Sequence, residues 1–170
     1  MTSKRPVIGT IAVIVLVVVA VGTISASAGT NRANQSGGGK LVGTWMTSVD
    51  RPGLPPLTSM QSYSKGNTVV EIANGGATVR SPSHGAWKHL GGRTYGATAV
   101  FFRYDPVSGA YLGTLKLRHE IEVASDGQSF TGVAIGELRD AAGNLLPGSN
   151  TRKDAVTGER INVEPLPDLP

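Results

Sequence analysis

The sequence predicts an all-β protein, a single antiparallel meander of about eight strands that closes into a barrel. The first observation is that apolar and charged residues alternate strictly along 115–123, the period of a strand with one buried face. The second is that Gly, Pro, Asn and Asp recur between short β-prone runs. The third is that no stretch after residue 30 has helical periodicity. A two-sheet sandwich is the structural alternative.

Turn residues divide the chain after residue 40 into the expected strands. Three prolines make 50–56 a loop, because proline cannot donate to a sheet. The hairpin of 94–104 and 111–123 turns at 105–109, which contains Pro and Gly. The expected strands are 41–49, 58–64, 68–73, 84–90, 94–104, 111–123 and 129–139. An eighth, weaker strand is expected around Leu145, where Pro147 and Gly148 interrupt the pattern.

The N-terminal part has the features of an export signal. Residues 7–24 are uncharged and follow Lys4 and Arg5, and small residues at 26–28 form an A-x-A cleavage pattern. The alternative is a retained membrane anchor. We therefore expect a secreted or extracytoplasmic protein with a leader at 1–28, a Gly-rich flexible linker at 29–40 and the barrel at 41–147. A loosely ordered tail is expected at 148–170.

Composition excludes several classes of function. Two of the 16 basic residues and none of the 12 acidic ones fall in 1–28, so the rest carries only a small positive charge and predicts no nucleic-acid binding. The remaining chain of about 140 residues suits one domain. There is no cysteine, which excludes disulfides and cysteine metal sites, and the three histidines lack a zinc spacing. No nucleophile elbow or phosphate loop is present, and no cofactor is expected.

The first strand carries a family resemblance. Gly43-Thr44-Trp45 resembles the G-x-W opening of lipocalin and calycin barrels. The stretches 84–87 (His-Gly-x-Trp) and 112–116 (Leu-Gly-Thr-Leu-Lys) are similar to uncharacterised secreted bacterial lipocalin-like proteins. The resemblance implies that Gly43 and Trp45 form the barrel floor and that a late arginine packs over Trp45, with Arg139 as the nearest candidate. It also implies a ligand-binding habit, without naming a ligand.

Three histidines are candidates for a site in the barrel. His119 shares the apolar face of its strand with Leu117 and Ile121, so it is either a satisfied core histidine or a contact to a ligand in the interior. His84 and His89 lie on opposite faces of one strand, and the resemblance favours His84 as the inward one. The expected ligand-binding residues are His84, Trp87, Tyr95, Phe101 and His119.

Two carboxylates interrupt apolar strands. Glu71 and Glu137 are expected on the outer surface, as most charged residues are. If either faced inward it would need an arginine or histidine partner, because burying a lone charge costs at least ~3 kcal/mol.

The expected function is the binding of a small apolar or amphipathic molecule inside the barrel. Glycines along the strands, Gly96, Gly113, Gly132 and Gly136, would leave a hollow interior. One alternative is an isomerase or cyclase in which a histidine of the interior moves a proton. A second alternative is a surface interaction protein with a filled barrel and no ligand.

Overall fold

The computed structural model describes residues 38–74 and 79–167. The expected leader at 1–28 and the linker up to residue 37 lie outside the described residues. The chain divides into two units, Met1–Thr30 and Asn31–Pro170, and the described residues all belong to the second. None of the described residues forms a helix with the length and apolar character needed to cross a membrane.

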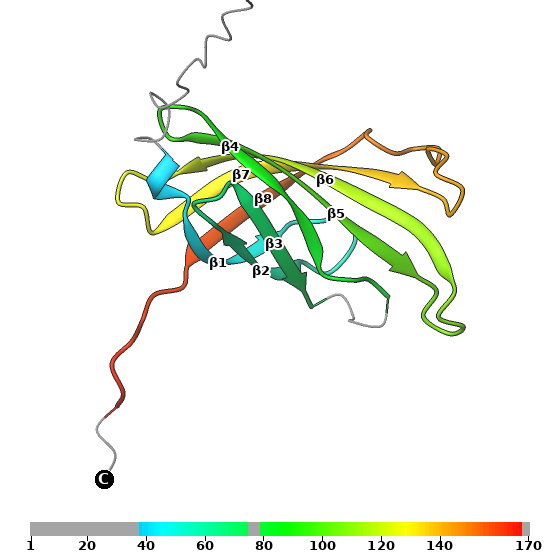
Figure 1. Cartoon of the computed structure of the whole chain (residues 1–170), viewed down its shortest axis with the longest axis horizontal. Coiled ribbons are helices and arrows are strands. Elements are labelled where there is room, and N and C mark those ends of the chain that lie inside the picture. The colour runs from blue at the N-terminus through cyan, green and yellow to red at the C-terminus, as the bar shows by residue number, and fades with distance from the viewer. Residues whose placement is uncertain (1–37, 75–78, 168–170) are drawn as a thin grey trace, which may run out of the picture. The chain divides into compact units, whose positions relative to one another are not determined.

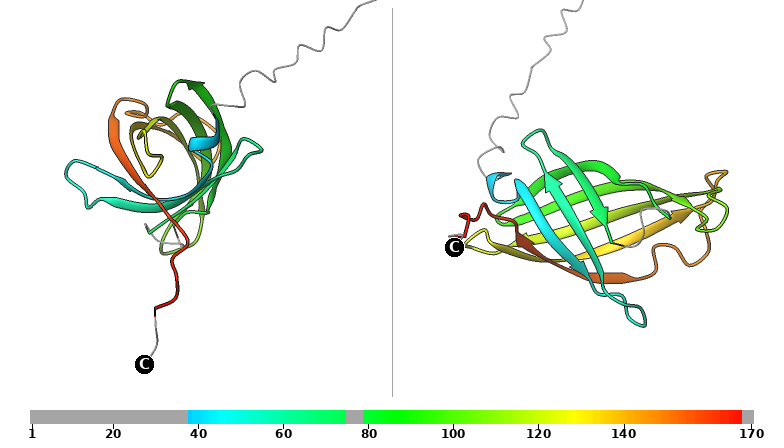
Figure 2. Two further views of the ribbon diagram at one scale, coloured as in Figure 1. Left: turned by 90° about the vertical axis from the view of Figure 1, so that its left-hand side faces the viewer. Right: turned by 90° about the horizontal axis from the view of Figure 1, so that it is seen from below.

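Eight antiparallel strands follow one another around a closed barrel (Figures 1 and 2). The strands are β1 (Gly43–Val49), β2 (Leu57–Tyr63), β3 (Thr68–Ala73), β4 (Ser83–Gly91), β5 (Thr94–Tyr104), β6 (Tyr111–Val123), β7 (Ser129–Arg139) and β8 (Lys153–Arg160). Each strand pairs with the next, and β8 pairs with β1, which leaves no free sheet edge in the ring. The predicted fold class, an all-β meander closing into a barrel, is confirmed, and the sandwich is excluded.

The strand that closes the barrel is not where the sequence predicted it. Leu145 makes only an isolated bridge to Arg139, and β8 lies in the segment that we expected to be a loosely ordered tail. Val156 and Gly158 of β8 are buried and alternate with exposed neighbours, so the pattern of a half-buried strand is present. It is hard to recognise because Val156 is the only large apolar residue that β8 contributes to the core.

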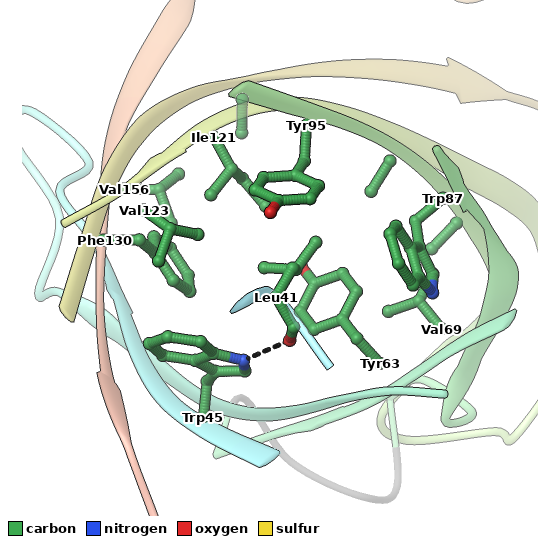
Figure 3. Close-up of a cluster of buried hydrophobic side chains, with 13 residues drawn as sticks. Leu41, Trp45, Tyr63, Val69, Trp87, Tyr95, Ile121, Val123, Phe130 and Val156 are labelled. Atoms are coloured by element: carbon green, nitrogen blue, oxygen red, sulfur yellow. Dashed lines mark hydrogen bonds between the residues drawn. The ribbon is translucent and has the colours of Figure 1, made fainter. Parts of the chain in front are cut away.

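One end of the barrel is closed by a cluster of buried apolar side chains (Figure 3). A short 3-10 turn, η2 (Gly38–Lys40), leads Leu41 into this end, where it is fully buried. The Trp45 indole Nε1 donates to the Leu41 carbonyl at 2.9 Å, and its ring centroid lies 5.0 Å from that of Phe130. The cluster consists of Leu41, Trp45, Tyr63, Val69, Trp87, Tyr95, Ala97, Ala99, Ile121, Val123, Phe130, Ala134 and Val156.

Arg160, the last residue of β8, covers this closed end. Its guanidinium carbon lies 4.2 Å from the centroid of the Trp45 ring, in the geometry of a cation–π contact. The same guanidinium donates to the carbonyls of Gly127 (2.6 Å), Val42 (2.8 Å) and Lys40. A Cβ on Gly43 would lie 2.4 Å from Arg160 Nη1, and Gly43 has φ +136°, so glycine is required beside the arginine. The arginine over Trp45 is therefore Arg160 and not Arg139.

At the opposite end three strands project beyond the ring. The long strands are β5, β6 and β7, with 11, 13 and 11 residues, whereas β1, β2 and β3 have only 7, 7 and 6. Figure 1 shows β5 and β6 reaching past the short strands. On the inner face of β6, Ile121 and Val123 are fully buried but Leu115 and Leu117 only half-buried. The interior is thus tightly packed at the Trp45 end and partly open to solvent at the Leu115 end.

Candidate functional site

A small cavity of mixed character lies inside the barrel, between the closed end and the projecting strands. Its volume is about 10 Å³, which is enough for one water molecule. β2, β3, β5 and β6 each contribute to its wall. The lining residues are Gln61, Tyr63, Val69, Glu71, Ala97, Ala99 and His119. Val69 and the two alanines make the wall apolar on one part, and the other four residues make it polar, so the cavity is amphipathic.

His119 supplies a hydrogen-bonding atom that the protein leaves unused. Its Nε2 is shielded from solvent and has no hydrogen-bond partner among the described residues. Burial lowers the pKa of His119 below its usual value, and the charge of Glu71 opposes this shift only in part. The ring is therefore neutral at pH 7. An unsatisfied buried polar atom costs about 1–3 kcal/mol, which any hydrogen-bonding group placed in the cavity would recover in part.

Glu71 belongs to a buried ion pair beside the cavity. Its Oε2 accepts from Arg80 Nη2 at 2.8 Å and from the Ser83 hydroxyl at 2.9 Å. The Arg80 and Glu71 side chains are 8% and 5% exposed, and the Arg80 guanidinium lies 3.8 Å from the centroid of the Phe101 ring. Arg80 is positioned by an isolated bridge to Arg103 of β5. We expected Glu71 on the outer surface, and this was wrong: it faces inward with the arginine partner that an inward carboxylate requires.

Gln61 and Tyr63 form the polar wall contributed by β2. The Tyr63 hydroxyl donates to Gln61 Oε1 at 2.5 Å, and both side chains are buried. Burial raises the pKa of Tyr63 far above its usual value, and the negative charge of Glu71 raises it further. The phenol is therefore neutral. This pair consists of neutral groups that can both donate and accept hydrogen bonds.

The structure places the five expected ligand-binding residues in three different environments. His119 lines the cavity, whereas Phe101 does not line it and lies under the Arg80 guanidinium. Trp87 and Tyr95 are core residues, with ring centroids 5.9 Å apart. His84 is exposed on the outer face of β4, so the expectation that it faces inward was wrong.

The other histidine of β4, His89, makes contacts within the protein. His89 is half-buried, its Nε2 lies 2.9 Å from the Gly92 carbonyl, and its ring is 5.0 Å from that of Tyr95. At Gly85, between the two histidines, a Cβ would lie 1.9 Å from the Thr98 carbonyl oxygen of β5. Glycine at this position therefore admits the neighbouring backbone.

Sequence reasoning missed the polar residues of the cavity for different reasons. Gln61 and Tyr63 alternate with exposed residues along β2, so the period of two was a usable signal. Arg80 carried no such signal, because it lies outside the named strands and reaches Glu71 only through the tertiary fold. The candidate site therefore combines one expected ligand-binding residue, His119, with Glu71, which was expected on the outer surface, and with neighbours that were not among the expected site residues.

Glu137 lies on the outer face, as we expected, but it is only 7% exposed and is surrounded by cations. Lys116, Arg118 and Arg139 approach its carboxylate at 3.1, 3.5 and 2.8 Å. Hydrogen bonds from Lys116 and Arg139 lower the pKa of Glu137 to about 2. This cluster accounts for Arg139, which also donates to the Gly143 carbonyl at 2.8 Å and is therefore a surface residue.

Comparisons with known proteins assign no family. No protein-family model matches this chain, and no curated protein matches it. Within the described residues no group of three or more His, Cys, Asp or Glu side chains is arranged to hold a metal ion.

Proposed function

We propose that this protein is an extracytoplasmic barrel that binds a small amphipathic molecule in its interior. The carrying observation is the unpartnered His119 Nε2 facing a cavity that adjoins half-exposed apolar side chains. The eight-stranded closed meander and the G-x-W opening support a lipocalin-like relationship. The uncharged segment 7–24, with Lys4 and Arg5 before it, supports export.

The inner face of β6 offers a path from the cavity to solvent. Leu117 pairs with Ala99, which lines the cavity, and His119 pairs with Ala97. Leu115, the next inward residue, pairs with Phe101. Because Leu115 and Leu117 are half-buried, an apolar chain lying along them would remove further apolar surface from water, at roughly 25 cal/mol per Å².

The size of the cavity sets a condition on this binding. A space of about 10 Å³ admits only the end of a molecule, so the rest must lie along Leu115 and Leu117 or displace side chains. Phe101 lies beside this path, and the Arg80 guanidinium lies over its ring. The ion pair with Glu71 fixes the Arg80 side chain in this position. The barrel is therefore nearly filled around the cavity, and binding is expected to be accompanied by local rearrangement.

A pair of substitutions on one strand tests interior binding. Ala99→Leu places a larger side chain in the cavity, whereas Thr98→Leu adds the same side chain on the outer face of β5, where Thr98 is exposed. The readouts are thermal shift across a panel of amphipathic molecules and native mass spectrometry of the full chain. We expect wild type and Thr98→Leu to respond and Ala99→Leu to lose the response while remaining folded. An equal response in all three would place binding elsewhere, and none in wild type would contradict the proposal.

The second candidate is an interaction protein that takes no ligand. It is favoured by a row of exposed apolar side chains across β1, β2 and β3, in which Met46 pairs with Met60 and Met60 pairs with Ile72. These residues are 43%, 45% and 49% exposed. This candidate predicts self-association that Ile72→Ser weakens, measured by sedimentation velocity, together with no ligand response in the thermal-shift panel.

The enzyme alternative has less support from the geometry. A histidine that moves a proton is usually oriented by a carboxylate within hydrogen-bond reach. Among the described contacts, Glu71 Oε2 accepts from Arg80 and Ser83, and no hydrogen bond joins it to His119. We therefore assign His119 a role in binding.

A further inference from the structure

The polar wall of the cavity determines which kind of head group it accepts. We propose that the group seated beside His119 is a single neutral oxygen, the hydroxyl or carbonyl head of the amphipathic molecule, and that carboxylate and ammonium heads are rejected. This inference rests on the proposed interior binding and adds the chemical class of the ligand.

The size of the cavity limits the head group. The cavity of about 10 Å³ holds approximately one oxygen-sized group. A carboxylate has two oxygens and, when charged, requires several hydrogen-bond donors. An ammonium group needs acceptors for three hydrogens. A hydroxyl or a carbonyl oxygen fits the space and requires one or two hydrogen bonds.

The charges of the residues around the cavity also limit the head group. Within the described residues around the cavity, the negative charge of Glu71 is already balanced by Arg80, at 2.8 Å. His119 and Tyr63 are both kept neutral by burial. A charged head group entering this wall would therefore find no unpaired counter-ion among the lining residues and would lose its hydration. A neutral head group avoids that cost.

The hydrogen-bonding groups of the cavity wall suit a neutral head group. His119 Nε2 is a buried nitrogen without a partner, and a neutral imidazole nitrogen is either a donor or an acceptor according to its tautomer. A ligand hydroxyl can pair with either tautomer, whereas a carbonyl pairs only with the protonated nitrogen. The Gln61–Tyr63 pair beside it is neutral and also able to donate and accept. The site is therefore complementary to an uncharged polar atom.

Three probes with one tail and different heads test the inference: octanol, octanoate and octylammonium. Affinities are measured by isothermal titration calorimetry on the full chain at pH 7.5. We expect octanol to bind at least tenfold more tightly than either ion, a difference of about 1.4 kcal/mol or more. Octanoate or octylammonium binding as tightly as octanol would overturn the neutral-head inference and leave interior binding standing. Failure of all three probes to bind would count against both proposals.

Two histidine substitutions locate the head group. His119→Leu removes the unpartnered nitrogen, and His84→Leu is the matched control on the outer face of β4. We expect His119→Leu to weaken octanol binding at least tenfold and His84→Leu to leave it unchanged, with circular dichroism confirming the fold of both. In ¹⁵N-histidine-labelled wild type, octanol should shift the His119 Nε2 resonance. Unchanged octanol affinity in His119→Leu, or an unmoved resonance with octanol bound, would refute the placement.

Discussion

Two Arg–Glu ion pairs of this barrel have almost the same length and very different burial, so replacing each arginine by methionine isolates the effect of burial. The Arg80–Glu71 pair is 2.8 Å long, with side chains 8% and 5% exposed. The Arg93–Glu122 pair is 2.7 Å long, with side chains 46% and 58% exposed. Methionine keeps an apolar stem of similar length and removes the charge and the donors.

The expected losses differ because the partner left behind differs in solvation. In Arg80→Met the Glu71 carboxylate stays buried and keeps the Ser83 hydroxyl, at 2.9 Å, as a donor. Removing one partner of a buried pair costs about 3–5 kcal/mol. The lost contact of the guanidinium with the Phe101 ring adds to this cost. In Arg93→Met the Glu122 carboxylate remains in water, and the expected loss is at most about 1 kcal/mol.

Urea unfolding at pH 7, followed by tryptophan fluorescence and circular dichroism, measures both losses. The double variant Arg80→Met/Glu71→Gln provides the internal check, because a neutral amide replaces the unpaired carboxylate. We expect it to be more stable than Arg80→Met alone by at least about 1 kcal/mol, within the usual range of coupling energies. Equal losses in Arg80→Met and Arg93→Met, or no recovery in the double variant, would refute the assignment of Arg80 as the partner of a buried charge.

The remaining predictions concern the closed end and two titrating groups. Arg160→Met removes three hydrogen bonds and the contact with Trp45, and it should lower the free energy of unfolding in urea by about 2–4 kcal/mol. Arg139→Met should lower it by about 1 kcal/mol or less. The reverse order of these losses would return the capping role to Arg139. Because the pKa of His119 is lowered in the folded protein, the unfolded chain binds more protons, and stability should fall as pH drops below about 6.5. His119→Leu should reduce that fall, measured by urea titrations at pH 7 and pH 5. The lowered pKa of Glu137, about 2, contributes stability above pH 4.5 that is lost between pH 4.5 and 2. Glu137→Gln should therefore flatten the acid-unfolding profile in that window, and an unchanged profile would contradict the ion cluster.

The misplaced residues of the sequence prediction have specific physical causes. The alternation along β6 correctly assigned Ile121 and Val123 to the interior, because a strand has a fixed two-residue period. The face of His84 was ambiguous, since inverting a strand exchanges its two faces without changing the pattern. Arg139 was chosen to cover Trp45 because β8 went unrecognised, and the arginine that does so is the last residue of that strand.

The sequence by itself determined the all-β class, the meander and the inward position of His119, because strand period and turn chemistry are local properties. Only the tertiary structure decided that the barrel is nearly filled and that Glu71 faces inward. Both depend on residues outside the strands: Arg80, between β3 and β4, reaches Glu71, and Leu41, before β1, is buried in the closed end. Contacts made by residues that lie outside the strands leave no periodic trace in the sequence, and the space beside His119 is what the packed side chains leave open.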